Sequence, residues 1–404
     1  MSNRKSSLRN LPRNIWIVTL TSFLTDISSE MILNLIPLFL ANVLRSGTAV
    51  VGLIEGIAET TSSLMKLYSG GLSDRLGKRK WLTVTGYALS AFSKPFLFFA
   101  QTWQGVLAVR FSDRLGKGIR TAPRDALVAG SIDEKQRGLA FGIHRAGDTA
   151  GAFLGLLIAA TIIWLTQANA ILLSRYTFQI VVLVSIFPAV LAVVVLAIWV
   201  KETAIEGKVK FPVLSMQGMT QPFKRFLVII ILFTLGNSSD AFIILRSQER
   251  GLTVLEIIFM LMAFNLIYAI LSGPLGALSD KIGRKKLIIA GWTAYGLIYL
   301  GFALSNSGGQ IFALYSLYGI YYAATEGTAK ALVADLVPNE RRGTAYGLYN
   351  AVIGLAALPA SLIAGLLWQG FFFWSGFGPA APFFFGASIS LLAGLLLWKF
   401  VPTS

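Results

Sequence analysis

Charged residues interrupt long apolar stretches of this sequence, and their spacing suggests chemistry. In a helix over residues 104–131, one arc of about 140° would carry Arg110, Asp113, Arg114, Lys117, Arg120, Arg124 and Asp125. Arginine keeps its charge in proteins, and its guanidinium group forks onto carboxylate or phosphate oxygens. We therefore predict that Arg110, Arg114, Lys117 and Arg120 bind an anionic or zwitterionic solute, with Asn237 and Tyr322 as further ligands.

Acidic residues lie in the same kind of apolar surroundings. The predicted proton carriers are Asp26, Glu30, Glu59, Asp240 and Glu326. Burial favours a neutral carboxyl group and a nearby cation favours the ionised one, so such groups can take up and release protons. Asp240 is the preferred carrier, because Arg246 is the nearest cation in its stretch.

Ion pairing between helices is the competing explanation for many of these charges. Ion pairing and a functional role are weighed equally for seven of these residues: Glu55, Lys66, Arg124, Asp125, Arg145, Asp148 and Lys330. Lys94 has no obvious partner beside Pro95, and we expect it to be structural.

These charges need a scaffold, and the composition indicates a membrane protein. The 404 residues are 55% hydrophobic and only 13% charged, against about 25% charged in soluble proteins. A membrane span needs about 20 apolar residues. Twelve stretches qualify: 14–44, 51–73, 81–101, 104–131, 138–166, 176–200, 223–248, 253–278, 286–305, 309–336, 343–369 and 379–401. We predict an all-α membrane protein with twelve transmembrane helices.

The basic residues between these stretches give an orientation. Most of them fall in the N-terminal tail, the even-numbered loops and the C-terminus, which predicts that both termini are cytoplasmic. The expected location is the cell membrane, as a multi-pass protein of a bacterial cytoplasmic membrane. The net charge of +16 is then a topology signal, and we expect no nucleic-acid partner.

Several chemistries are excluded or disfavoured by residue types. The chain has no cysteine, which excludes disulfides and thiolate metal sites, and His144 is its only histidine. It also lacks an ATP-binding Gly-x-x-x-x-Gly-Lys-Ser/Thr loop. We expect no enzyme activity, no metal and no cofactor.

The two halves of the sequence repeat each other. Residues 70–80 recur at 276–286 with an offset of 206, residues 137–142 recur at 342–347 with an offset of 205, and Ser28-Ser29-Glu30 recurs as Ser238-Ser239-Asp240. The first repeat predicts a tight turn at Gly77 and at Gly283. We predict bundles over 1–200 and 225–404 joined by a polar cytoplasmic linker, 201–224.

The repeated Gly-x-Leu-Ser-Asp-Arg-x-Gly-Lys-Arg-Lys segment resembles the loop signature of the major facilitator superfamily (MFS). With the span count and the duplication, the resemblance covers essentially the whole chain. It implies two pseudo-symmetric six-helix bundles around a central cavity, exposed alternately to the two sides of the membrane. In that family the loop aspartate, here Asp74 and Asp280, latches one state. The implied gating set is Asp74, Arg75, Gly77, Asp280 and Gly283.

Two other family motifs match less well. Residues 114–120 keep the arginine and the first glycine of the span-four motif, but Lys117 and Arg120 replace its glutamine and second glycine. The antiporter motif of span five retains Gly147, Gly151 and Gly155, but Leu156 stands in place of its proline.

We therefore expect a monomeric secondary transporter in the lipid bilayer. The expected cargo is a small polar solute, anionic or zwitterionic, moved at the expense of a proton gradient. Export is slightly favoured over import by family habit. The alternatives are a polyspecific drug/proton exporter, a lysolipid transporter and, from another class, a non-transporting membrane receptor.

Overall fold

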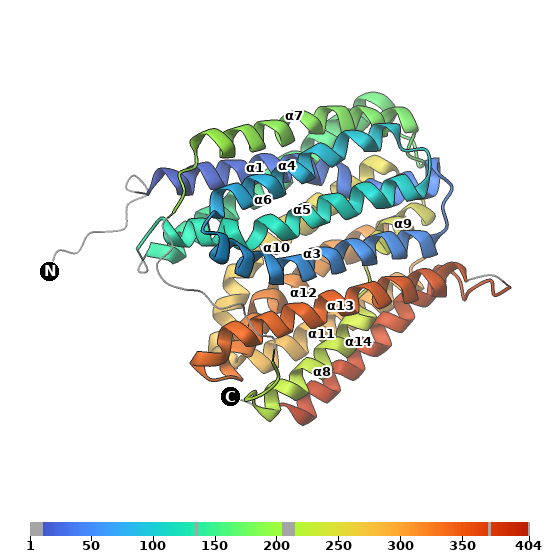
Figure 1. Cartoon of the computed structure of the whole chain (residues 1–404). Coiled ribbons are helices and arrows are strands. Elements are labelled where there is room, and N and C mark those ends of the chain that lie inside the picture. Colours follow the sequence, from blue (N-terminus) through green and yellow to red (C-terminus); the bar gives the residue numbers. More distant parts are fainter. Residues whose placement is uncertain (1–10, 134–135, 204–214, 371–372, 403–404) are drawn as a thin grey trace. The chain divides into compact units, whose positions relative to one another are not determined.

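The computed structural model describes residues 11–133, 136–203, 215–370 and 373–402, without the side chains of Asp74 and Glu340. In this part of the chain the long regular elements are all α-helices (Figure 1), and each predicted apolar stretch contains at least one of them. The predicted all-α membrane fold is confirmed. The division at residues 201–224 stays a prediction, because residues 204–214 lie outside the described part.

Among the described residues, eight helical segments are long and apolar enough to cross a membrane: Arg13–Val43, Arg137–Gln167, Arg175–Trp199, Gln221–Glu249, Val254–Ile282, Arg284–Leu304, Arg342–Gln369 and Ala381–Phe400. Four further predicted spans are helical without meeting this criterion: α3 (Thr48–Leu76), α4 (Arg79–Ser93), α5 (Trp103–Gly130) and α12 (Gly308–Asp335). Charged residues interrupt α3 and α5. Helix α4 has only 15 residues, because the chain continues as a 3₁₀-helix from Lys94. The less apolar helices thus include those that carry most of the predicted site.

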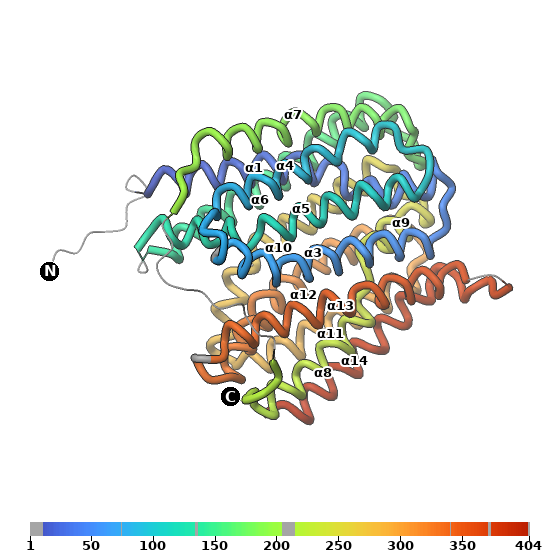
Figure 2. The backbone as a smooth tube through the Cα atoms, in the orientation of Figure 1, coloured from blue at the N-terminus to red at the C-terminus, as the bar shows by residue number. Residues whose placement is uncertain are grey.

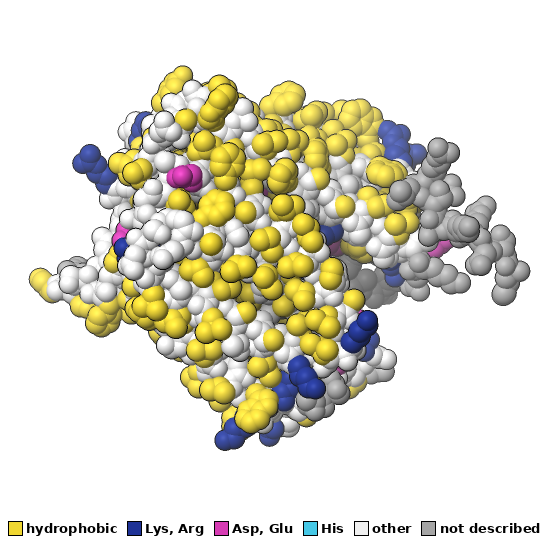
Figure 3. Space-filling model, turned by 180° about the vertical axis from the view of Figure 1, so that it is seen from behind, with side chains coloured by type: hydrophobic (Ala, Val, Ile, Leu, Met, Phe, Trp, Pro, Cys, Tyr) yellow, Lys and Arg dark blue, Asp and Glu magenta, His cyan; other side chains and the backbone are white. Residues whose placement is uncertain are grey.

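Hydrophobic side chains cover the middle of the molecular face in Figure 3, and Lys and Arg side chains lie toward its edges. Large apolar side chains are exposed along the predicted spans, among them Trp164, Phe187 and Trp398 at 62%, 74% and 68%. Such exposure is costly in water but favourable against lipid tails. The surface therefore fits a bilayer.

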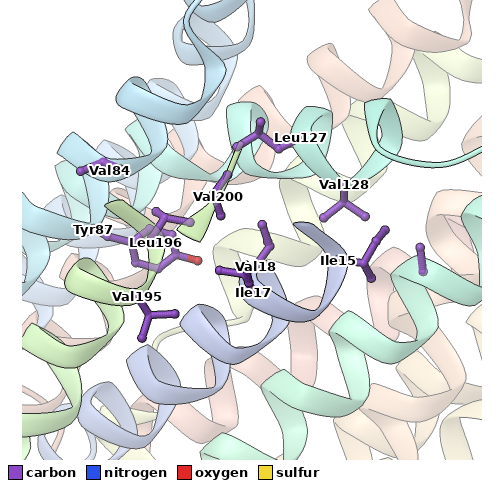
Figure 4. Close-up of a cluster of buried hydrophobic side chains, with 11 residues drawn as sticks. Ile15, Ile17, Val18, Val84, Tyr87, Leu127, Val128, Val195, Leu196 and Val200 are labelled. Atoms are coloured by element: carbon purple, nitrogen blue, oxygen red, sulfur yellow. The ribbon is translucent and has the colours of Figure 1, made fainter. Parts of the chain in front are cut away.

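The chain forms two compact units. Unit 1 contains α1 (Arg13–Leu33), the second half of α3, α4, α5, most of α6 (Arg137–Gln167) and most of α7 (Arg175–Trp199). Its core joins α1, α4, α5, α6 and α7 through buried apolar side chains (Figure 4). These side chains are Ile15, Ile17, Val18, Val84, Tyr87, Leu127, Val128, Ala140, Val195, Leu196 and Val200.

Unit 2 contains residues 34–63, residues 160–177 and the described residues from 215 onward. Its longer elements are α8 (Gln221–Gly236), α9 (Ala241–Glu249), α10 (Val254–Ile282), α11 (Arg284–Leu304), α12, α13 (Arg342–Gln369) and α14 (Ala381–Phe400). Helices α8, α11, α13 and α14 run side by side in Figures 1 and 2.

The first half of α3 also belongs to unit 2, where it packs closely against α13. The Thr60 hydroxyl donates to the Gly354 carbonyl at 2.6 Å, and a Cβ on Gly56 would lie 2.8 Å from the Leu358 Cα. Small residues are therefore required along this contact.

Three predicted helices are interrupted where the sequence pattern predicts continuity. After Leu33 the first stretch continues as a short helix, α2 (Ile36–Leu38), with Pro37 in its first turn, and a π-helical turn, η2 (Phe39–Val43). The third stretch changes at Lys94 to a 3₁₀-helix, η3 (Lys94–Phe99), because Pro95 has no N–H to donate. The seventh breaks between Gly236 and Ala241. It also begins at Gln221, before the predicted 223, since the Thr220 hydroxyl caps the first turn.

Candidate functional site

Close packing of α4 against α5 fixes the position of Arg120 in unit 1. A Cβ on Gly116 would lie 2.5 Å from the Gly86 carbonyl oxygen, so the two backbones nearly touch. Arg120 Nη1 donates to the Ser90 hydroxyl at 2.6 Å, and its guanidinium carbon lies 4.5 Å from the centroid of the Tyr87 ring. Arg120 is only 6% exposed, so its side chain is enclosed between the two helices.

The other cations of the α5 stripe differ in exposure. Arg110 is 2% exposed, and its Nη1 lies 4.0 Å from the carboxylate of Asp113, which is also buried. Arg114 and Lys117 are partly exposed. The predicted stripe therefore separates into two enclosed cations, Arg110 and Arg120, and two accessible ones.

Lys94 is the best enclosed ammonium group of unit 1. Its Nζ donates to the Ser28 hydroxyl at 2.7 Å and to the Ser29 hydroxyl at 3.1 Å, and the residue is 3% exposed. Its charge is attracted by Asp113, Asp26 and Glu30, in decreasing order of strength among the three. The position is thus structural, as expected, and it also connects α1 to the charges of α5.

The two predicted proton carriers of α1, Asp26 and Glu30, are both partly exposed. Asp148 and Glu30 repel the charge of Asp26, and Lys117 and Arg120 attract it. Protonation of Asp26 would relieve the repulsion, and deprotonation would strengthen its attraction to Lys117. The surroundings therefore couple the proton on Asp26 to the accessible cations of α5.

Ion pairs account for the neighbouring charges. Arg124 contacts Asp125 at 2.8 Å and donates to the Ser22 hydroxyl at 3.1 Å. His144 Nε2 lies 3.8 Å from the carboxylate of Asp148, one helical turn away. Arg124 and Asp125 thus pair with each other within α5, and the link from Arg124 to another helix is its bond to Ser22 on α1.

The break in the seventh span holds two predicted residues of unit 2. Asn237 ends α8 and its amide donates to the Tyr321 hydroxyl at 3.5 Å. Asp240 precedes α9 and accepts from the Tyr315 hydroxyl at 3.5 Å. Arg246, the nearest cation along the chain, is bound instead to Glu249 and to the carbonyl of Ala303.

Glu326 and Tyr322 lie on α12, also in unit 2. The carboxylate of Glu326 accepts from the Tyr268 hydroxyl at 2.5 Å and lies 3.4 Å from Nζ of Lys330. The ring of Tyr322 packs edge-on against Phe264 at 5.3 Å between centroids. Glu59, on the unit 2 part of α3, is exposed. Glu326 and Lys330 therefore pair within α12, one helical turn apart.

The predicted turns are confirmed at both glycines. Gly77 has φ of 64° and Gly283 has φ of 95°, a region that other residues rarely adopt. In unit 2, Arg284 follows the turn and contacts Asp280 at 3.5 Å and Asp335 at 2.5 Å. Arg75 is exposed, and the side chain of Asp74 lies outside the described part.

Sequence reasoning overlooked three partners of these groups. Asp113 was recognised only as a member of the stripe, and Tyr268 and Tyr315 were not singled out. No spacing rule links Tyr315 to Asp240, which lie 75 residues apart. The run Gly-Asn-Ser-Ser-Asp at 236–240, rich in residues that favour turns, was the available signal for the break.

A pocket of about 650 Å³ lies beside η3 and the start of α5 in unit 1. Its lining is largely apolar, with Phe92, Phe96 and Phe99, and it includes none of the predicted charged residues. This pocket is therefore separate from the charged cluster. In the described part of the chain no group of three or more His, Asp or Glu side chains is arranged to hold a metal ion.

Unit 1 therefore holds two partly exposed cations, Arg114 and Lys117, and two partly exposed acidic residues, Asp26 and Glu30. Comparison with known proteins gives the context. Residues 18–245 and 225–404 match the profile of the Major Facilitator Superfamily. An uncharacterised MFS-type transporter of Methanocaldococcus jannaschii is 38% identical over 397 residues, 96% of this chain and 95% of that protein.

More distant proteins share the fold. The multidrug resistance protein MdtG of Escherichia fergusonii is 25% identical over 295 residues, 70% of this chain and 69% of that protein. A POT family transporter crystallised with 5-aminolevulinic acid superimposes with a TM-score of 0.81 at 12% identity, covering 98% of this chain and 97% of that one. The nucleoside transporter NupG gives 0.79 at 11% identity, covering 96% and 100%. This chain belongs to the major facilitator superfamily and is a multi-pass membrane transporter.

Proposed function

We propose that the chain is a proton-coupled secondary transporter of a small polar organic solute that carries an acidic group. The observation that carries this proposal is the charged cluster of unit 1. Arg114 and Lys117 are accessible there, whereas Arg110 and Arg120 are enclosed by protein groups. We assign Arg114 and Lys117 to the acidic group of the solute, because their side chains are partly exposed, whereas those of Arg110 and Arg120 are buried.

Coupling is assigned to Asp26, with Glu30 as its neighbour on α1. Lys117 acts on the charge of Asp26, so an anion bound to Lys117 weakens the attraction that keeps Asp26 ionised. Solute binding then favours proton uptake, which is the linkage that symport requires. This linkage moves proton and solute in the same direction and favours import, whereas family habit slightly favours export. Export driven by an inward proton gradient would require the opposite linkage, in which binding of the solute releases the proton.

The latch of the second half is assigned to Asp280, Arg284 and Asp335, which form one ion-paired set in unit 2. The corresponding loop of the first half, with Asp74, Arg75 and Gly77, is assigned the same role by the repeat. The cytoplasmic membrane is the proposed location, and the relatives come from an archaeon and from bacteria.

The test is transport by proteoliposomes with an imposed pH gradient, across a panel of amino acids, hydroxy acids and dicarboxylates. We expect Arg114→Ala and Lys117→Ala to abolish transport while the proteins remain folded. Lys201→Ala, at an exposed position in the stretch after α7, is the matched control and should transport normally. If both site variants transport as well as the wild type, the stripe is structural and the proposal fails.

A polyspecific drug exporter is the second candidate. It is favoured by the similarity to the multidrug resistance protein MdtG and by the packed aromatic rings of α10 and α12. Proton-driven efflux of lipophilic cations that does not depend on Arg114 would support it over the first.

A further inference from the structure

The break in the seventh span is stabilised by specific contacts within unit 2. Gly236 lets α8 approach α14, since a Cβ there would lie 2.8 Å from the Ile389 Cβ. The Tyr295 hydroxyl donates to the Gly236 carbonyl at 2.9 Å, which replaces a bond lost from the helix. Asp240 is held at the end of this break, where its carboxyl group is partly exposed.

Within the described part of the chain, no Lys or Arg side chain balances the charge of Asp240. Its carboxylate accepts a hydrogen bond from the Tyr315 hydroxyl at 3.5 Å. A charge at membrane depth is costly unless it is paired. The carboxylate therefore favours a positive group supplied from outside the protein.

Aromatic rings surround this position. We call Phe264, Tyr315, Tyr318 and Tyr322 the α10–α12 ring set; the three tyrosines recur on one face of α12. Their centroids lie 5.0, 5.9 and 5.3 Å from that of Phe264. The hydroxyls of Tyr318 and Tyr322 feel the charge of Asp240. Phe264 and Tyr322 are partly exposed, so ring surface stays accessible close to the carboxylate.

A carboxylate beside accessible aromatic faces is the chemistry that recognises an organic ammonium group. The carboxylate supplies the charge, and the ring faces attract the cation and its attached carbons. The internal repeat allows this position on α12 to be compared with the equivalent position on α5. At the offset of 205 found for the second motif, Tyr315 and Tyr322 correspond to Arg110 and Lys117. One repeat thus presents cations where the other presents rings.

We infer that Asp240 and the α10–α12 ring set bind an organic ammonium group. This inference rests on the proposed function only in taking the chain as a transporter of a small organic solute. It assigns Asp240 to the solute and leaves proton coupling to Asp26 and Glu30.

The test uses three probes with the same carbon skeleton: 4-aminobutanoate, butanoate and butylamine. Their binding to the purified full-length protein is measured by thermal shift and titration calorimetry at neutral pH. We expect the two probes that carry an ammonium group, butylamine and 4-aminobutanoate, to bind the wild type. Asp240→Asn should weaken butylamine binding by about 10- to 100-fold and leave butanoate binding unchanged. Arg114→Ala should do the reverse.

Two more variants separate the carboxylate from the rings. Tyr322→Leu removes a partly exposed ring and should weaken butylamine binding by about 2- to 30-fold. Asp133→Asn, an exposed loop position, is the control for loss of one carboxylate and should bind all three probes normally.

The outcomes distinguish this inference from the proposed function. If butylamine does not bind, or binds equally well to Asp240→Asn, the ammonium site is wrong, whatever butanoate does. If butylamine binding depends on Asp240 but butanoate binding is absent or independent of Arg114, the proposed function fails and the ammonium site stands.

Discussion

Replacing Gly116 by alanine should loosen the α4–α5 contact that holds Arg120. The new Cβ would lie 2.5 Å from the Gly86 carbonyl oxygen and 3.0 Å from the Ser90 backbone nitrogen. Ordinary contact begins near 3.4 Å, so the helices must separate by about 0.9 Å. Overpacking of this kind costs about 1–3 kcal/mol, and the gain from replacing a helical glycine offsets about 0.5–1 kcal/mol of it.

The matched control is Gly142→Ala in α6, where a Cβ would meet nothing within 4 Å. This variant receives the helix gain without the clash, so the two free energies of unfolding should differ by about 1–3 kcal/mol. Thermal unfolding in detergent, followed by tryptophan fluorescence, measures the difference. Separation of the helices should also lengthen the 2.6 Å bond between Arg120 and Ser90. Equal stability of the two variants would refute the close packing and the positioning of Arg120 derived from it.

Three further predictions follow from individual contacts. Lys94→Met removes the ammonium group that donates to two serine hydroxyls near Asp113, and it should destabilise the protein by roughly 3–5 kcal/mol. The control Lys286→Met, at an exposed position, should leave the stability unchanged. Equal melting temperatures of the two variants would contradict this prediction. Gly56→Leu should lower the melting temperature because its Cβ meets the Leu358 backbone at 2.8 Å, whereas Gly273→Leu, with nothing within 4 Å, should not. Thr253→Ala breaks the capping box of α10 and should cost about 1 kcal/mol, and an unchanged unfolding midpoint would show that the cap is dispensable.

Local patterns in the sequence were sufficient to predict many elements. The apolar stretches predicted the helices, and the repeated loop predicted the left-handed glycines at 77 and 283, because only glycine adopts such a turn easily. The contact between Glu326 and Lys330 is likewise local, since residues four apart are neighbours on a helix.

Long-range packing decided what the sequence could not predict. Helical periodicity placed Arg110, Arg114, Lys117 and Arg120 on one face, but a face of this width borders more than one neighbour. Close approach at Gly86 and Gly116 turned Arg120 toward α4, where Ser90 and Tyr87 enclose it. The partners of Lys94 lie more than 60 residues away on α1, and no local pattern relates them.

The seventh span shows a different reason for failure. Mean apolarity over 223–248 predicts one helix, because leucine, isoleucine and phenylalanine outweigh the short polar run in any window of span length. The break depends on four residues, and it is stabilised by Tyr295 from α11. The short run of turn-favouring residues therefore indicates the break, whereas the mean apolarity of the stretch does not.

The most direct test of the central claim is proton movement driven by a solute gradient alone. Proteoliposomes with equal pH on both sides and a pH-sensitive dye inside receive each member of the amino acid, hydroxy acid and dicarboxylate panel. At least one solute should change the internal pH through the wild-type protein, and the Arg114→Ala, Lys117→Ala double variant should give no change. If the folded wild type moves no protons with any of these solutes, or if the double variant moves them as fast, the account of a proton-coupled solute site on α5 is contradicted.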